Sequence, residues 1–261
     1  MDRRKRCIPA ERCLVELTKR DLLILDDVVR CGFLDSVQIA REHFHSHDRA
    51  LHRMRQLVDA RLLNATLLSS RRPNLYSCTR LGLDALADHG FATDRLRLPA
   101  PVRSSAVEHL VLLNDLRLYC AALAQLGALE LLEWNGGRGD DARAAGLTRQ
   151  GLAPDAIVFL GGGPRERTVF AEADCGHEGA DLEDKLARYS RVLPRPDTEL
   201  WLICHGDQAR IQTVERMCRR AGVDRSTRLF ARADTVSRPP KPLAPKLVRP
   251  VDAAPSGGRR W

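Results

Sequence analysis

Apolar residues recur three or four positions apart in the first quarter of the chain, with polar residues between them. This spacing collects the apolar side chains on one helical face, and it predicts helices over residues 17–31, 36–44 and 49–61. Thr18 is a suitable N-cap for the first of these helices. In the second helix we expect Val37 to be among the residues that face inward.

Two short runs with strand-like composition follow these helices. Residues 64–69 and 75–79 predict strands that flank a turn, and residues 81–89 predict a fourth helix. Three helices followed by a β-hairpin are typical of a winged helix-turn-helix. In that fold the third helix enters the major groove of DNA, and the hairpin tip touches the backbone.

The third predicted helix has a basic face, and two arginines occupy the hairpin tip. The candidate DNA-contacting residues are Arg49, His52, Arg53, Arg55, Gln56, Arg71 and Arg72. Of these, we expect Arg49, Arg53 and Gln56 to face bases. The other three arginines are expected to face phosphates. A winged helix can also bind another protein, and a basic helix face can be merely solvated, so both alternatives stay open.

The second half of the chain alternates between strand-like and helix-like segments. The pattern predicts helices over residues 106–124, 181–193 and 208–220, and strands over residues 129–134, 154–160, 168–174, 199–204 and 228–231. Strands mixed with helices in this way predict an α/β domain, and the whole chain is α+β.

Composition divides the chain further. We expect a basic arm over residues 1–16, a winged-helix domain over 17–92, a linker over 93–104, an α/β domain over 105–236 and a disordered tail over 237–261. Two prolines in the linker, Pro99 and Pro101, prevent a continuous helix there.

Charge is distributed unevenly along these segments. Residues 1–100 hold 18 Lys and Arg against 13 Asp and Glu, and residues 238–261 hold 6 against 1. The middle of the chain holds 18 against 20 and is therefore slightly acidic. Cationic ends around an acidic centre indicate a polyanionic partner that is bound outside the centre. Solubility alone is the alternative explanation.

Cysteine and apolar content exclude several classes of protein. The eight cysteines form no CxxC pair, so neither a zinc site nor a disulfide framework is expected. No apolar run is long enough to cross a membrane, and no signal-peptide core follows the charged N-terminus. We therefore expect a cytoplasmic protein with no membrane partner.

Acidic residues gather at one end of the predicted hairpin in the second domain. Asp155 opens the first strand, and Glu172 and Asp174 close the second strand on one face. Antiparallel pairing would bring the three carboxylates together, and such a cluster needs a cation or protons to neutralise it. Mg²⁺ prefers oxygen ligands of this kind, so the three residues are candidate metal ligands.

The order helix, three strands, helix, strand, helix, strand resembles the PD-(D/E)XK nuclease-like core. With the winged helix, residues 17–234 resemble the replication-relaxation family of bacterial proteins, which are often plasmid-borne. The residues that carry the resemblance are Leu17-Thr18-Lys19-Arg20-Asp21, His109 with Asn114, Pro154-Asp155, Glu172-Ala173-Asp174, and Lys185 with Tyr189. The resemblance implies a link to plasmid replication or DNA relaxation and no established reaction.

The nuclease resemblance implies a catalytic set of Asp155, Glu172 and Lys185. The two carboxylates would hold Mg²⁺, which polarises the scissile phosphate and activates a water molecule. Such sites usually carry a lysine two residues after the glutamate, but this chain has Asp174 there, which would repel a phosphate. We expect Lys185 to supply the missing cation from the following helix, or Asp174 to act as a third metal ligand.

The sequence therefore favours a DNA-binding protein of a plasmid or mobile element that acts in replication, mobilisation or its control. Its nuclease-like domain is either inactive or a Mg²⁺-dependent endonuclease, and a winged-helix transcriptional repressor is the other alternative. Double-stranded DNA is the expected partner. A relaxase, a replication protein and a second copy of the chain are candidate protein partners.

Overall fold

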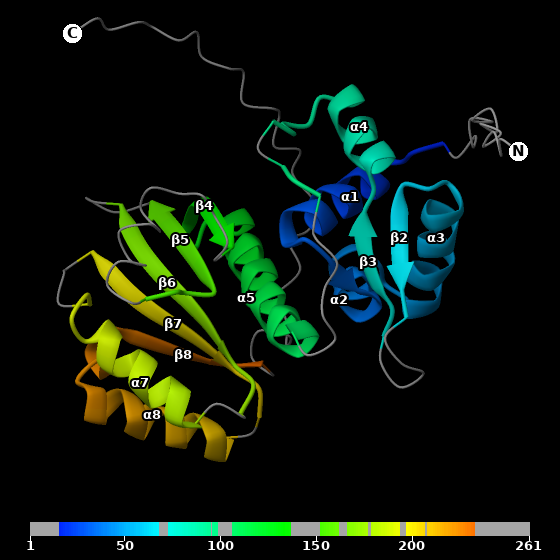
Figure 1. Ribbon diagram of the computed structural model, residues 1–261. Helices are drawn as coiled ribbons and strands as arrows, with labels where there is room; N and C mark the ends of the chain where they lie inside the picture. Colours follow the sequence, from blue (N-terminus) through cyan, green and yellow to red (C-terminus); the bar gives the residue numbers. More distant parts are fainter. Residues whose placement is uncertain are drawn as a thin grey trace, which may run out of the picture. The chain divides into compact units, whose positions relative to one another are not determined.

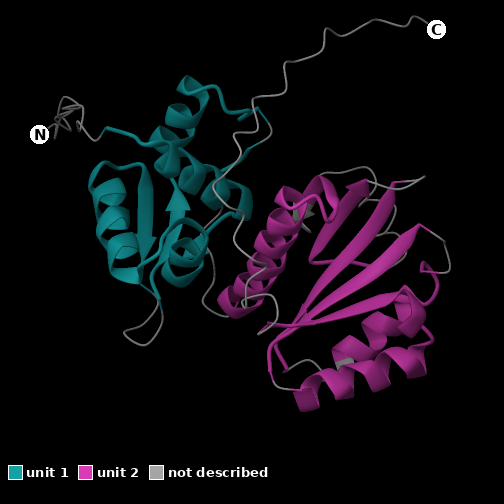
Figure 2. Cartoon of the chain, turned by 180° about the vertical axis from the view of Figure 1, so that it is seen from behind, with its two compact units in different colours: residues 1–102, 249–261 teal, residues 103–248 magenta. Residues whose placement is uncertain are grey.

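The protein consists of two compact units, one within residues 1–102 and one within residues 103–248 (Figure 2). The computed structural model describes residues 16–67, 73–94, 96–98, 106–136, 152–161, 166–176, 179–193, 197–206 and 208–232. Several predicted features lie outside these residues. They are Arg71 and Arg72, residues 1–15 of the basic arm, most of the linker and the whole tail.

The first unit consists of helices around a small antiparallel sheet (Figure 1). Its elements are α1 (Lys19–Cys31), β1 (Leu34–Asp35), α2 (Ser36–His43), α3 (His47–Asp59), β2 (Leu63–Thr66), β3 (Leu75–Cys78) and α4 (Arg80–Asp88). The strand order is β1-β3-β2. The four predicted helices and two predicted strands are confirmed. The sequence did not predict β1, because two residues are too few to show an alternating pattern.

Capping residues set where the first two helices begin. The Thr18 side chain accepts a hydrogen bond from the Asp21 amide, and the Asp21 carboxylate accepts one from the Thr18 amide. Asp35 and Gln38 form the same reciprocal pair at the start of α2. The inward orientation predicted for Val37 is wrong, because this side chain is 48% exposed. The buried stripe of α2 includes Ile39, two positions away and about 200° around the helix.

The second unit is a five-stranded mixed sheet between helices. Its elements are α5 (Val107–Gln125), β4 (Glu130–Gly136), β5 (Ala156–Gly161), β6 (Arg167–Asp174), α7 (Gly179–Tyr189), β7 (Thr198–Cys204), α8 (Gln208–Ala221), the short 3-10 helix η2 (Asp224–Ser226) and β8 (Thr227–Ala231). The strand order is β4-β5-β6-β7-β8. Strands β4, β5 and β6 pair antiparallel, whereas β6, β7 and β8 pair parallel. The predicted order of helices and strands is confirmed.

Both faces of this sheet are covered (Figure 1). Leu112, Leu116 and Cys120 of α5 pack on one face, and the other face packs against α7 and α8. Because side chains alternate along a strand, Phe170 of β6 faces α7 and α8 while Ala171 faces α5. Even-numbered positions of β6, including those of Glu172 and Asp174, therefore lie on the α7 side of the sheet.

No helix within the described residues is long and apolar enough to cross a membrane. The six cysteines in this part of the chain are all free thiols, and four of them are buried. They pack as small apolar side chains within the two units.

Candidate functional site

The β5–β6 hairpin brings two acidic residues to adjacent positions. Ala156 pairs with Ala171, so continuing the register places Asp155 opposite Glu172. The Ala173 amide donates a hydrogen bond of 2.9 Å to Asp155 Oδ2, which holds this carboxylate beside the end of β6. Glu172 is only 3% exposed. The two carboxylates therefore meet where β5 begins and β6 ends, and that of Glu172 is buried.

A lysine from α7 reaches both carboxylates. Lys185 Nζ donates a short hydrogen bond to Glu172 Oε2 and lies 3.8 Å from Asp155 Oδ1. Tyr189 is one turn further along α7, and its hydroxyl donates to Glu172 Oε1. Residues four positions apart share a helical face, which is why α7 presents both donors to the same carboxylate.

A histidine from α5 completes the group. His109 Nε2 lies 3.0 Å from Asp155 Oδ2. We call His109, Asp155, Glu172, Lys185 and Tyr189 the acid–base cluster. Its members come from α5, from the start of β5, from β6 and from α7. It is therefore a product of the tertiary fold, and no single segment contains it.

Protonation within the acid–base cluster is strongly perturbed. The hydrogen bond with Asp155, followed by one with Cys175, raises the pKa of His109 from 6.5 to about 10. Burial opposes ionisation of Asp155, but the hydrogen bond with His109 and the charge of Lys185 outweigh it and lower its pKa. His109 and Asp155 thus form an imidazolium–carboxylate pair at neutral pH.

Glu172 and Tyr189 shift in the direction that favours their neutral forms. Burial, and then the charge of Asp155, raises the pKa of Glu172 well above its ordinary value, although Lys185 opposes this. Burial, and then the charge of Glu172, raises the pKa of Tyr189. The negative charge of Asp155 and Glu172 is therefore neutralised within the protein, by bound protons and by the ammonium of Lys185.

Asp174 lies apart from the acid–base cluster. Arg210, near the start of α8, donates to both of its carboxylate oxygens at 2.7 and 2.6 Å. The Gly176 amide donates a further bond of 3.1 Å. Among the described residues, no three His, Cys, Asp or Glu side chains form a group that could hold a metal ion. In this arrangement, protein donors hold oxygens of all three carboxylates that the sequence predicted as metal ligands.

The replication-relaxation family model matches residues 25–198. The chain belongs to the replication-relaxation family. This span includes α2 and α3 of the first unit and every residue of the acid–base cluster. No curated protein and no solved structure matches the chain significantly. Family membership links the protein to replication and leaves its molecular activity open.

Helix α3 of this replication-relaxation protein carries most of the predicted DNA-contacting residues. Arg49, His52 and Arg55 are exposed on it. Ala50, Met54 and Leu57 are buried on its opposite side. The exposed face of α3 thus carries two arginines and a histidine.

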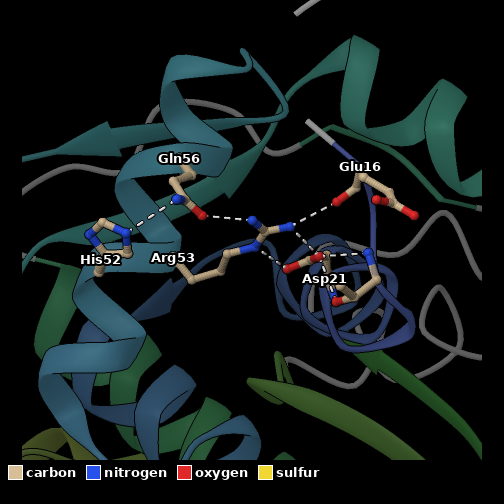
Figure 3. A network of polar contacts seen from close by, with 6 residues as sticks. Glu16, Asp21, His52, Arg53 and Gln56 are labelled. Atoms are coloured by element: carbon tan, nitrogen blue, oxygen red, sulfur yellow. Dashed lines mark hydrogen bonds and ion pairs between the residues drawn. The ribbon is translucent and has the colours of Figure 1, made fainter. Parts of the chain in front are cut away.

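Arg53 and Gln56 are engaged inside the first unit (Figure 3). Arg53 Nε and Nη2 donate to the two oxygens of Asp21 at 2.8 and 2.6 Å, and Nη1 donates to Gln56 at 2.6 Å. Asp21 is 1% exposed, so this ion pair is buried on one side. The structure places the Arg53 guanidinium against Asp21 of α1, and its contact with a base stays a prediction.

Sequence reasoning did not place four of these residues in a site. His109, Tyr189 and Asp21 were recognised only as carriers of the family resemblance, and Arg210 received no role. The four-residue spacing of Lys185 and Tyr189 was a usable local signal. Arg210 contacts a residue 36 positions away, and Arg53 contacts one 32 positions away, so no local pattern indicates either pair.

Proposed function

We propose that the protein is a DNA-binding protein of a plasmid or other mobile element, acting in replication, mobilisation or its control. In this proposal the first unit is a winged helix that binds duplex DNA. The observation that supports it most is α3, which exposes Arg49, His52 and Arg55 on one face and buries apolar side chains on the other. Its place after α2 and before the β2–β3 hairpin matches the order of a winged helix.

Salt-dependent duplex binding tests this proposal. We expect the full chain to bind duplex DNA with an affinity that falls steeply as salt rises, because arginines that neutralise phosphates release counterions. The double variant Arg49→Ala/Arg55→Ala should weaken binding. It should also reduce the slope of log K against log salt by about two. Fluorescence anisotropy with a labelled duplex at several salt concentrations measures both quantities.

A charge-matched control separates contact from net charge. Arg80→Ala/Arg188→Ala removes the same number of positive charges from exposed positions on α4 and α7. It should change the salt slope much less than the α3 variant does. Equal slopes for the wild type and the α3 double variant would reject α3 as the DNA-binding element.

A second candidate function is a Mg²⁺-dependent DNA endonuclease or nickase using Asp155, Glu172 and Lys185. The observation in its favour is that Lys185 contacts both carboxylates. Lys185 thus supplies the cation that such sites usually carry two residues after the glutamate, where this chain has Asp174. Against it, both oxygens of Glu172 and Oδ2 of Asp155 already accept hydrogen bonds from protein donors. No hydrolytic step through Mg²⁺ follows from this arrangement.

Incubation of supercoiled plasmid with the protein and Mg²⁺ or Mn²⁺ distinguishes the two candidates. If the protein only binds DNA, we expect the plasmid to stay supercoiled under both ions. Nicked or linear product that disappears in Asp155→Ala and Glu172→Ala, with DNA binding intact, would establish the endonuclease instead. Glu183→Ala, an exposed acid on α7, is the matched control and should behave as the wild type does.

A further inference from the structure

A chain of polar side chains runs from the first turn of α1 to the exposed face of α3 (Figure 3). It begins at Asp21, whose Oδ2 accepts hydrogen bonds from the Thr18 amide at 2.7 Å and the Thr18 hydroxyl at 2.6 Å. Arg53 binds both oxygens of this carboxylate and also donates to the Glu16 carbonyl at 3.0 Å. These contacts fix the guanidinium in one position.

Arg53 determines how the Gln56 amide is oriented. A guanidinium can only donate hydrogen bonds, so the Gln56 atom that Arg53 Nη1 contacts at 2.6 Å must be the amide oxygen. The amide nitrogen therefore points the other way, where it lies 3.2 Å from His52 Nε2. The orientation follows from the chemistry of arginine, so it does not depend on telling oxygen from nitrogen by position alone.

Gln56 in turn determines where the proton of His52 lies. An amide nitrogen is a donor and accepts nothing, so His52 Nε2 has to accept. The ring proton of the neutral imidazole is then on Nδ1. Figure 3 shows the second ring nitrogen on the side away from Gln56. His52 is exposed, so this N–H donor is available to a ligand.

We propose that the chain Asp21–Arg53–Gln56–His52 presets His52 as a hydrogen-bond donor, through Nδ1–H, to the N7 atom of a purine in the major groove. This inference rests on the proposed binding of duplex DNA by the first unit. Both purines present N7 as an acceptor in the major groove, whereas cytosine presents only an amino donor there, so a single fixed donor favours a purine over cytosine. Arg53 and Gln56 are positioning residues that act through His52.

A His52 ring held in one tautomer can select a base in a way that a free ring cannot. A neutral imidazole with a free ring can rotate and exchange tautomers, so it donates to or accepts from a base without preference. Holding Nε2 as an acceptor removes one tautomer before DNA binds, which makes the contact selective. The discrimination therefore depends on residues that never touch DNA.

Binding-site selection followed by atomic substitution in the DNA tests the inference. A preferred duplex is selected with the full-length wild type from a random pool. Its purines are then replaced one at a time by 7-deazapurines, which lack the N7 acceptor. We expect one replacement to weaken wild-type binding by about fivefold to tenfold, the effect of losing one hydrogen bond. The same replacement should not weaken binding by His52→Ala any further.

Two variants separate contact from positioning. His52→Ala should lose about fivefold to tenfold in affinity for the selected duplex and little for an unrelated duplex. Gln56→Met keeps His52 but removes the amide, so it should show part of that loss and a smaller deazapurine effect. His89→Ala, at the end of α4, is the matched control and should keep the wild-type preference. Thermal unfolding of each variant checks that the first unit is intact.

Several results would overturn the inference. One is that His52→Ala weakens every duplex equally, which would place the imidazole on a phosphate. Another is that no 7-deazapurine position depends on His52, and a third is that Gln56→Met retains the full effect. If the wild type binds no duplex even at low salt, the proposed function fails and the inference fails with it.

Discussion

Replacement of Lys185 by methionine should lower the free energy of unfolding of the second unit by about 3 kcal/mol at neutral pH. Methionine keeps most of the volume of the side chain but removes the ammonium that contacts Glu172 and Asp155. Glu172 is 3% exposed and would lose the only cation that contacts it among the described residues, because His109 pairs with Asp155. Urea unfolding followed through the fluorescence of Trp201, which is buried in this unit, measures the loss.

The loss should depend on pH with a definite sign. The pKa of Glu172 is already above its ordinary value of 4.5, and the absence of Lys185 raises it further. A carboxyl with a raised pKa in the folded state binds more protons than it does in the unfolded state, so stability falls as pH rises from 4.5 through the folded pKa. The variant should therefore regain stability as the pH is lowered towards about 5.

Two companion variants make this result specific. Glu172→Gln in the Lys185→Met background should restore most of the stability, because a neutral amide needs no cation. Arg188→Met removes an exposed cation from the same helix and should change stability by no more than about 0.5 kcal/mol. A loss of equal size in Lys185→Met and Arg188→Met would show that the ion pairs of Lys185 contribute nothing particular.

The second unit should also lose about 3 kcal/mol of stability between pH 6.5 and 10 through His109 alone. The pKa of His109 is raised in the folded state, so its contribution is complete below 6.5 and disappears as pH rises through the folded value. The expected size is less than the full shift implies, because the side chain is 26% exposed. Unfolding curves recorded across this pH range give the quantity directly.

The comparison with His109→Gln isolates the histidine. Glutamine can donate to Asp155 but does not titrate, so the variant should show a flatter dependence on pH. Buried thiols such as Cys120 and Cys204, whose pKa values burial raises to about 12, also destabilise the fold at high pH. The thiols destabilise the wild type and His109→Gln equally, so their contribution cancels when one stability curve is subtracted from the other. Parallel curves for the two proteins would mean that the His109–Asp155 pair does not contribute to the pH dependence of stability.

Much of the fold could be predicted from the sequence because its determinants are local. Apolar spacing located the helices, and Thr18 marked the start of α1 through a contact three residues away. The strand-like composition of the runs that became β5 and β6 predicted their antiparallel pairing, which places Asp155 opposite Glu172. Strand β1 was missed because it pairs through only two residues, which show no periodicity.

The partners of the charged residues were harder to predict, because charge pairs join distant segments. Lys185 was expected near Glu172 because it lies on the helix that directly follows the acidic strand, and the two residues are in contact. Asp174 was expected beside Asp155 and Glu172, because side-chain alternation along the strand puts Glu172 and Asp174 on one face. In the structure, Arg210 from α8 binds Asp174 instead. Arg53 was assigned to DNA from its helical face, and the sequence gives no sign that Asp21 takes up its guanidinium.

Asp21 has two roles that are usually performed by separate residues. Its carboxylate receives the Thr18 amide and so caps α1, and it also clamps Arg53 of α3. Fraying of the first turn of α1 would therefore also break the ion pair with Arg53 of α3. Opening at the start of α1 is thus coupled to the loss of one contact of α3, which stays packed through Ala50, Met54 and Leu57.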